Sequence, residues 1–273
     1  MSIVWLDGEL VPLAEARLPI TDHGLTVGDG LFETMKVVDG VAFALTRHLR
    51  RLARTAAGLG LAAPPEPMLR GAVAAAIAAN PGCGRVRLTV TGGPGPAGTT
   101  RGDTAPTVLV VCSPAASWPP EEHVAIVRWT RNESGALAGL KTTSYAENVI
   151  ALAEANERGS GEAIFANTRG DLCEGTGTNV FVVVDGRLVT PPLSSGCLAG
   201  VTRELVCELV DVDERSVPLA ALRESPEAFL TSSTRDVHPI ATVDGVALPS
   251  CPGPLTVMAA AALAARRAVD LDP

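Results

Sequence analysis

The chain has 273 residues, of which 47% are apolar, so it can bury a sizeable core in one large domain or two smaller ones. Its formal charge of −8 at pH 7 and its lack of a basic patch argue against nucleic acids and anionic membranes as partners. Small molecules are therefore the expected ligands.

The six cysteines show no C-x-x-C spacing and the four histidines lie far apart in the sequence, so we expect neither a metal site nor a disulfide framework. The opening residues MSIVWLDGEL lack the basic and apolar regions of a targeting signal, and the Ala-rich runs are too short to span a bilayer. These features predict reduced thiols and a cytoplasmic location.

The first half of the chain begins with two β-prone runs around Asp39-Gly40, a pair that suits the positive φ angles of a tight hairpin. Leucines and alanines then recur at helical spacing, with Thr46 as the expected N-cap and Gly58 and Gly60 as stops. A second helix is predicted over about 66–80. Two strands follow, RVRLTV and TVLVVC, and the Gly/Pro-rich loop 92–106 joins them.

Residues 113–122, SPAASWPPEE, have the composition of a linker. We therefore expect an N-terminal domain over 1–113, a linker over 114–122 and a C-terminal domain over 123–273. Beyond the linker, EAIFAN, VFVVVDGRLVT and FLTSS are strand-like, and 144–158, 201–211 and 255–267 have helical periodicity. Strands and helices mix in both halves and hairpin turns imply antiparallel pairing, so the predicted class is α+β.

Lysine is rare, because only Lys36 and Lys141 occur against twenty arginines. An amine can lose its proton and act as a nucleophile or base, whereas a guanidinium stays protonated. Ser144 and Glu147 have the spacing of a capping box, which would place Lys141 just before a helix N-terminus. The positive end of that helix dipole would favour the neutral amine. Lys141 is therefore a candidate catalytic residue, although a solvated surface lysine would fit the same pattern.

Two further motifs follow Lys141 in the sequence. Glu174 begins the Gly/Thr-rich turn EGTGTN, and Gly200-Val201-Thr202 opens a predicted helix whose backbone N–H groups and threonine hydroxyl suit a phosphate. Each motif alone also fits an ordinary turn carboxylate or an ordinary helix start.

Six motifs in one order, taken together, resemble the class IV, fold type IV pyridoxal phosphate (PLP) enzymes. That family includes branched-chain and D-amino-acid aminotransferases and aminodeoxychorismate lyase. The similarity extends over about residues 3–265 and implies a small N-terminal α/β domain and a larger C-terminal pseudo-barrel α/β domain. The motifs are GDGLFET, RHLRRL, LKTTSYAENV, EGTGTN, TPPLSSGCLAGVTR and FLTSSTRDVHPI.

The resemblance implies that Lys141 forms the Schiff base, an aldimine, with PLP and moves the proton at the substrate Cα. Glu174 matches the carboxylate that pairs with the pyridine nitrogen, and Arg51 matches the phosphate-binding arginine. Tyr145 lies near the family's tyrosine beside the cofactor oxygen. The remaining cofactor contacts implied by the family are Leu198 on the ring, Val201 and Thr202 at the helix start, and Ser232 or Ser233 on the phosphate.

The substrate is less defined than the cofactor. Phe32 is expected to contact the substrate, and a phenylalanine at this position is more similar to branched-chain enzymes and (R)-amine transaminases. The run TSSTRDV is closer to D-amino-acid enzymes, but their R-x-H carboxylate clamp is absent from 92–106. Arg131 and Arg101 are candidate carboxylate holders, though either also fits a surface charge. We expect a transaminase that moves an amino group between a D-amino acid or (R)-amine and a 2-oxo acid by a ping-pong mechanism. The alternatives are aminodeoxychorismate lyase, which releases pyruvate and p-aminobenzoate, and a branched-chain aminotransferase. The family also implies a homodimer.

Overall fold

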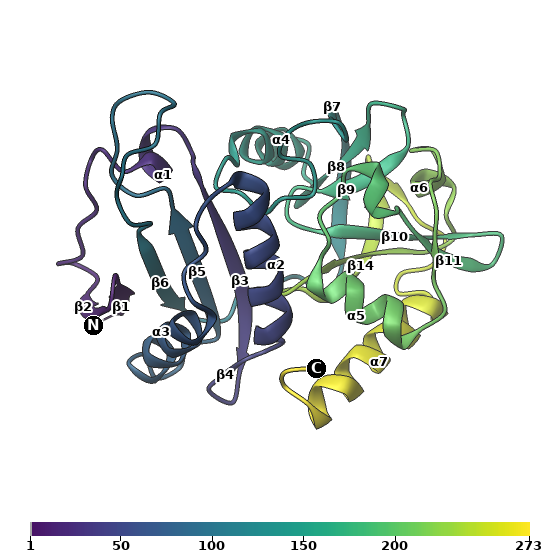
Figure 1. Cartoon of the computed structure of the whole chain (residues 1–273). Coiled ribbons are helices and arrows are strands. Elements are labelled where there is room, and N and C mark those ends of the chain that lie inside the picture. Colours follow the sequence, from purple (N-terminus) through teal and green to yellow (C-terminus); the bar gives the residue numbers. More distant parts are fainter. Residues whose placement is uncertain (1) are drawn as a thin grey trace. The chain divides into compact units, whose positions relative to one another are not determined.

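The computed structural model describes residues 2–273, which divide into two compact units (Figure 1). The N-terminal unit contains the chain up to Ala116 together with Leu140–Tyr145 and Asp270–Pro273. The C-terminal unit contains Ser117–Gly139 and Ala146–Val269. The short segment that carries Lys141 therefore packs with the N-terminal unit, although it follows the expected linker. The division into domains at 114–122 stays a prediction.

The N-terminal unit is built on an antiparallel sheet with the strand order β2-β1-β6-β5-β3-β4. Asp39 and Gly40 adopt φ angles of 49° and 78°, so the predicted hairpin turn between β3 and β4 is confirmed. The predicted strands 85–90 and 107–112 are confirmed as β5 and β6. The strands are β1 (Ile3–Leu6), β2 (Glu9–Pro12), β3 (Gly30–Val38), β4 (Val41–Ala42), β5 (Arg85–Thr91) and β6 (Val108–Ser113).

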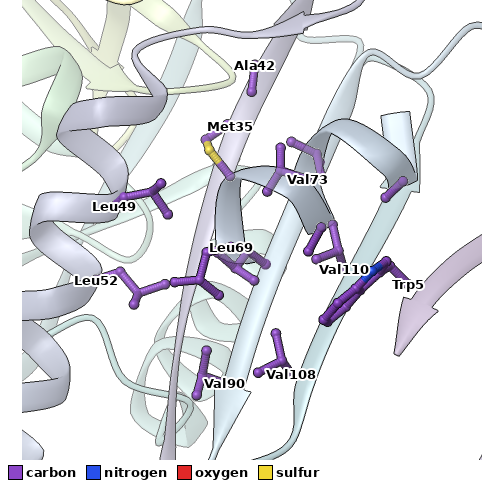
Figure 2. Close-up of a cluster of buried hydrophobic side chains, with 14 of the residues drawn as sticks. Trp5, Met35, Ala42, Leu49, Leu52, Leu69, Val73, Val90, Val108 and Val110 are labelled. Carbon is purple, nitrogen blue, oxygen red and sulfur yellow. The ribbon is translucent and has the colours of Figure 1, made fainter. Parts of the chain in front are cut away.

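Three helices belong to this unit: α1 (His23–Thr26), α2 (Leu45–Leu59) and α3 (Glu66–Ala78). The apolar faces of α2 and α3 pack against the sheet, because leucines and valines on both helices share one cluster with strand residues. Figure 2 shows side chains of that cluster, including Leu49, Leu52 and Leu69 from the helices and Met35 and Val110 from the strands. This core fixes α2 beside β3.

The start of α2 differs from the prediction. Ala44, in the left-handed region, is the N-cap, and Thr46 lies inside the helix. The Asp272 carboxylate accepts from the Thr46 amide at 2.7 Å and from its hydroxyl at 2.6 Å. A carboxylate 226 positions away thus satisfies the helix start. Gly60 ends the helix in the left-handed region, as predicted, whereas Gly58, the other predicted stop, lies inside the helix.

The C-terminal unit contains a nine-stranded sheet with the order β12-β11-β10-β13-β14-β7-β8-β9, and β15 pairs with β14. The hairpin β10–β11 and the pairs β10–β13, β13–β14 and β8–β9 are antiparallel, as expected. The pairs β7–β8, β7–β14 and β11–β12 are parallel, which the prediction did not anticipate. The strands are β7 (Glu122–Arg131), β8 (Glu162–Asn167), β9 (Leu172–Gly175), β10 (Asn179–Val184), β11 (Arg187–Thr190), β12 (Asp213–Glu214), β13 (Ala228–Ser232), β14 (Asp236–Val243) and β15 (Val246–Ala247).

The helices of the C-terminal unit are α4 (Ala146–Glu157), the 3₁₀ turn η1 (Leu193–Ser195), α5 (Val201–Leu209), α6 (Ala221–Glu224) and α7 (Pro254–Val269). Three of them, α4, α5 and α7, lie close to their predicted ranges, whereas η1 and α6 were not predicted. Together the two units confirm the α+β class. None of the helices within residues 2–273 is long and apolar enough to cross a membrane.

The predicted capping box at the start of α4 is not formed. The Ser144 hydroxyl donates to the Gly28 carbonyl at 3.0 Å, and the Glu147 carboxylate binds Arg131 instead of the helix start. Both side chains therefore connect segments that are distant in sequence, which the local S-x-x-E spacing could not reveal.

Candidate active site

The candidate residues fall into one set in each unit, and each set is described by itself. In the N-terminal unit, the segment with Lys141 runs along the start of β3. The Phe32 amide donates to the Lys141 carbonyl at 3.2 Å, and the Thr143 amide donates to the Gly30 carbonyl at 2.8 Å. The Lys141 amide donates to the Thr55 hydroxyl on α2 at 3.3 Å. The Lys141 backbone is thus held from both a strand and a helix.

The Lys141 side chain lies against aromatic rings. Its Nζ is 4.3 Å from the Phe32 ring centroid and 5.9 Å from that of Tyr145. The two rings meet edge to face, with centroids 5.3 Å apart. The structure therefore brings together Lys141, Tyr145 and Phe32, three residues that the sequence singled out.

Arg87 on β5 also contacts this cluster, and the sequence analysis missed it. Its Cζ lies 3.6 Å from the Phe32 ring centroid, and Lys141 Nζ lies 4.3 Å from the same centroid. The two positive charges are therefore close to each other. Partial desolvation lowers the pKa of Arg87, the Tyr145 phenol raises it, and the guanidinium stays protonated. Among residues 2–273 its side chain has no hydrogen-bond or ion-pair partner.

Arg51 lies on the buried face of α2 in an ion pair with Glu33 of β3. Glu33 Oε1 is 2.8 Å from Arg51 Nε, and Oε2 is 2.5 Å from Nη2. His48 Nδ1 lies 2.6 Å from the same Oε2. The sequence analysis named Arg51 but neither of these partners, because the motifs GDGLFET and RHLRRL are separate in the chain and their contact depends on the packing of α2 against β3.

Arg101 does not have the free guanidinium that a substrate clamp would need. Its Nε and Nη2 each donate to the Asp29 carboxylate at 2.7 Å, and its other donors reach the carbonyls of Leu59 and Gly60. Asp29 has a lowered pKa, chiefly because of the Arg101 hydrogen bonds. Arg101 therefore fixes the loop 92–106 within the N-terminal unit.

In the C-terminal unit, Glu174 is bound by two donors. Arg131 Nε donates to its Oε1 at 3.0 Å, and the Leu198 amide donates to its Oε2 at 2.9 Å. Arg131 also donates to Glu147 at 2.5 Å and to Asn148 at 3.1 Å. These contacts orient Glu174 and support a positioning role for Arg131, so the expected role as a substrate carboxylate holder stays a prediction without geometric support.

The turn EGTGTN that follows Glu174 is held from the core side of the sheet. Glu162 accepts from the Thr176 amide at 3.0 Å and from the Thr178 hydroxyl at 3.1 Å, and its own side chain is buried. The Asn148 side chain donates to the Thr176 carbonyl at 2.5 Å. The turn is therefore rigid, and the position of Glu174 follows from it.

The other cofactor candidates of this unit surround the start of α5 and the end of β13. Gly200 is the N-cap of α5 and supplies no side-chain cap, so the first amides of the helix have no intrahelical acceptor. Asn179 donates to the Leu198 carbonyl at 2.8 Å, and a Cβ on Gly200 would lie 2.0 Å from Asn179 Oδ1. The structure places Val201 and Thr202 in the first turn of α5, and Ser232 and Ser233 at the end of β13.

The part of the chain that the structure describes, residues 2–273, holds no group of His, Cys, Asp and Glu side chains suited to a metal ion. The six cysteines are free, and burial raises the pKa of Cys197 to about 11. Burial therefore disfavours the reactive thiolate form of Cys197.

Comparisons with known proteins identify the family of this chain. A bifunctional aminodeoxychorismate lyase / D-amino acid transaminase of Mycobacterium tuberculosis is 31% identical over 277 residues, which cover 92% of this chain and 94% of that protein. The branched-chain aminotransferase of Thermoproteus uzoniensis superposes with a TM-score of 0.89 at 31% identity, over 98% and 94% of the two chains.

A fold IV transaminase from Curtobacterium pusillum has a TM-score of 0.84 at 32% identity, over 96% and 92% of the chains. These neighbours confirm the predicted fold type IV. The amino-transferase class IV family matches residues 30–243, which contain every candidate residue described above. The chain therefore belongs to the class IV aminotransferases, a family of enzymes that depend on PLP.

Proposed function

We propose that this enzyme binds PLP and transfers an amino group from an amino acid or amine to a 2-oxo acid, with Lys141 as its catalytic residue. The observation that carries the proposal is the placement of Lys141. One of only two lysines in the chain has its backbone fixed by β3 and α2 and its amine packed against Phe32 and Tyr145.

The residues present fit the cofactor by the chemistry of their donors. Arg51 offers a guanidinium with a fixed plane to a phosphate, and the start of α5 offers amides without intrahelical acceptors. Thr231 adds a buried hydroxyl that has no hydrogen-bond partner within residues 2–273 and precedes Ser232 and Ser233. Each unit therefore offers donors of the kind that a phosphate binds, and Leu198 is assigned the apolar contact with the ring.

Bound PLP supplies an aldehyde carbon and a ring that withdraws electrons from the substrate Cα. Glu174, held by Arg131 and the Leu198 amide, would keep a proton on the ring nitrogen, because a carboxylate there stabilises the positive charge. Lys141 would take the proton from the substrate Cα and return it to the cofactor carbon next to the ring. Tyr145 and Phe32 would limit where that amine can move.

Arg87 favours a substrate with a carboxylate over a simple amine. It is a guanidinium without an acidic partner within residues 2–273, and it shares the Phe32 ring with Lys141. A carboxylate beside it would complete a charge-assisted pair. We therefore place amino acids, D-amino acids included, ahead of (R)-amines as donors. One relative carries both a D-amino acid transaminase and an aminodeoxychorismate lyase name, so the lyase remains the second candidate.

We also propose a homodimer whose interface includes a surface of the N-terminal unit. A run of apolar side chains is exposed in the first 27 residues of the N-terminal unit, a pattern typical of a protein–protein contact. These residues are Leu10, Leu13, Leu18, Ile20, Leu25 and Val27.

A half-reaction tests the transaminase. Protein loaded with PLP is incubated with one donor at a time and no acceptor: D-alanine, D-glutamate, L-leucine or (R)-1-phenylethylamine. We expect about one equivalent of the keto product per subunit and a loss of the visible absorbance band, as ping-pong kinetics require. If no donor gives product while aminodeoxychorismate yields pyruvate and p-aminobenzoate, the enzyme is the lyase.

A further inference from the structure

We propose that Glu33 and His48 are positioning residues that fix the Arg51 guanidinium as a ligand for the phosphate of PLP. The inference rests on the proposed function, because the phosphate belongs to the cofactor. It assigns a task to the Glu of GDGLFET and the His of RHLRRL, to which the resemblance gave none.

The contacts determine the direction of the guanidinium. Glu33 accepts from Nε at 2.8 Å and from Nη2 at 2.5 Å, so two parallel hydrogen bonds fix the plane of Arg51. The Glu33 side chain is fully buried and that of Arg51 is 6% exposed. Because both side chains are buried, water competes poorly with either partner, and the plane of the guanidinium is fixed.

The charges of the cluster are balanced. Burial alone would raise the pKa of Glu33, but Arg51, and secondarily His48, outweigh it and lower that pKa to about 2. Burial lowers the pKa of His48 and outweighs the opposing effect of Glu33, and the positive charges of Arg51 and Lys141 add to the lowering. His48 is therefore neutral at pH 7 and supports Glu33 through an Nδ1–H donor without adding charge. A phosphate would meet directed donors rather than an excess of positive charge.

The secondary structure connects this cluster to Lys141. Successive residues of a strand face opposite sides, so β3 presents Phe32 toward Lys141 and Glu33 toward α2. His48, Arg51 and Thr55 share one face of α2, and Thr55 accepts the Lys141 amide. One strand and one helix thus position both the amine and the arginine.

The test compares PLP with pyridoxal, which lacks the phosphate, in the purified full-length protein. Dissociation constants are measured for wild type, Glu33→Gln and Glu33→Asp by absorbance titration. We expect Glu33→Gln to weaken PLP binding about tenfold or more, since a charge-assisted hydrogen bond to Arg51 is lost. Pyridoxal binding should change less than about twofold. Glu33→Asp, which keeps the charge, should restore part of the PLP affinity.

Two backgrounds make the comparison specific. In an Arg51→Lys protein, Glu33→Gln should produce no further change in the ratio of the PLP and pyridoxal constants, because the effect passes through Arg51. Glu66→Gln serves as the matched control. Glu66 is an exposed carboxylate of the same unit, paired with Arg70 at 2.8 Å, and its loss should leave both constants unchanged.

If Glu33→Gln weakens the binding of PLP and of pyridoxal by the same factor, the effect is a general structural one and the inference is overturned. If circular dichroism shows that Glu33→Gln does not fold, His48→Gln replaces it. A higher ratio of the PLP to the pyridoxal dissociation constant than in wild type then supports the inference, and an unchanged ratio overturns it. Failure of wild type to bind PLP at all would instead overturn the proposed function, so the two failures are distinguishable.

Discussion

Two ion pairs hold the charged cofactor candidates, and they differ in burial and in the hydrogen bonds that join each pair. In the N-terminal unit, Glu33 makes two bonds to Arg51 and the pair is almost fully buried. In the C-terminal unit, a single hydrogen bond joins Arg131 to Glu174, and each side chain is 13% exposed.

The partners of the two pairs also differ. Glu33 is shared only with His48 among the hydrogen bonds recorded for residues 2–273, whereas Arg131 divides its donors among Glu174, Glu147 and Asn148 and lies 3.9 Å from the Phe165 ring. A deeply buried pair is strongly destabilised when one charge is removed, because the other charge stays buried. A shared, shallower pair has other partners and access to water. We therefore expect the first pair to matter for folding and the second mainly for alignment.

The largest effect separates the two pairs directly. Glu33→Ala leaves the Arg51 charge buried and should lower the free energy of unfolding by about 3–5 kcal/mol. Arg131→Ala should cost about 1–3 kcal/mol, because Glu174 keeps the Leu198 amide as a donor. Urea denaturation followed by circular dichroism measures both. Equal losses would show that the difference in burial has no energetic consequence.

A second comparison tests how rigidly the turn after Glu174 is held. A Cβ on Gly175 would lie 2.2 Å from Thr178 Oγ1 and 3.1 Å from Glu162 Cδ, whereas one on Gly177 would meet nothing within 4 Å. Gly175→Ala should therefore cost about 1–3 kcal/mol of stability, and Gly177→Ala less than about 0.5 kcal/mol. Thermal unfolding of the two variants measures this difference. A tolerated Gly175→Ala would mean that the turn is more adaptable than the packing implies.

Each unit also contains a buried histidine with a lowered pKa, mainly because of burial: His48 behind Arg51 and His238 beside Arg235. When the folded pKa of a histidine lies below its unfolded value of about 6.5, the unfolded chain binds a proton more readily than the folded chain. Stability should therefore fall as pH drops from 7 to 5. Glu33 adds nothing in that window, because its contribution is lost only as pH falls below 4.5 toward about 2.

His48→Gln and His238→Gln should each flatten this pH dependence, and His48→Gln should flatten it more, because His48 is the more deeply desolvated of the two. Urea midpoints at pH 5, 6 and 7 provide the measurement. An unchanged slope in both variants would mean that other groups control acid sensitivity.

The smallest effect on stability is expected at Arg87. Its side chain is exposed and, within residues 2–273, forms no hydrogen bond, so Arg87→Met should change the free energy of unfolding by less than about 0.5 kcal/mol. It should raise KM for D-alanine or D-glutamate about tenfold and leave KM for (R)-1-phenylethylamine nearly unchanged, since only the acids have a carboxylate to bind. An equal rise for acids and amine would argue against carboxylate recognition by Arg87.

Local signals in the sequence predicted the elements that depend on local physics. The Asp39-Gly40 hairpin and the Gly60 helix stop follow from backbone preferences of single residues. The prediction missed β7, whose parallel pairing with β8 and β14 depends on strands that are distant in the sequence. The N-cap of α2 was also mispredicted, since Asp272 comes from the far end of the chain.

The site shows the same limit. The rarity of lysine drew attention to Lys141, and the combined motifs drew attention to Arg51 and Glu174. The partners that orient them, Glu33 and Arg131, depend on contacts between separate motifs and could not be identified from spacing. Arg87 could not be distinguished from nineteen other arginines until its position over Phe32 was known.

The central claim is that the amine of Lys141 reacts with the aldehyde of PLP. Borohydride reduction of the loaded protein fixes such a link covalently, and peptide mapping by mass spectrometry locates it. We predict the added mass on the peptide with Lys141 in wild type and in Lys36→Arg, which keeps the charge of the only other lysine. Lys141→Arg should carry no label and transfer no amino group. Label on another residue, or retained turnover in Lys141→Arg, would contradict this account.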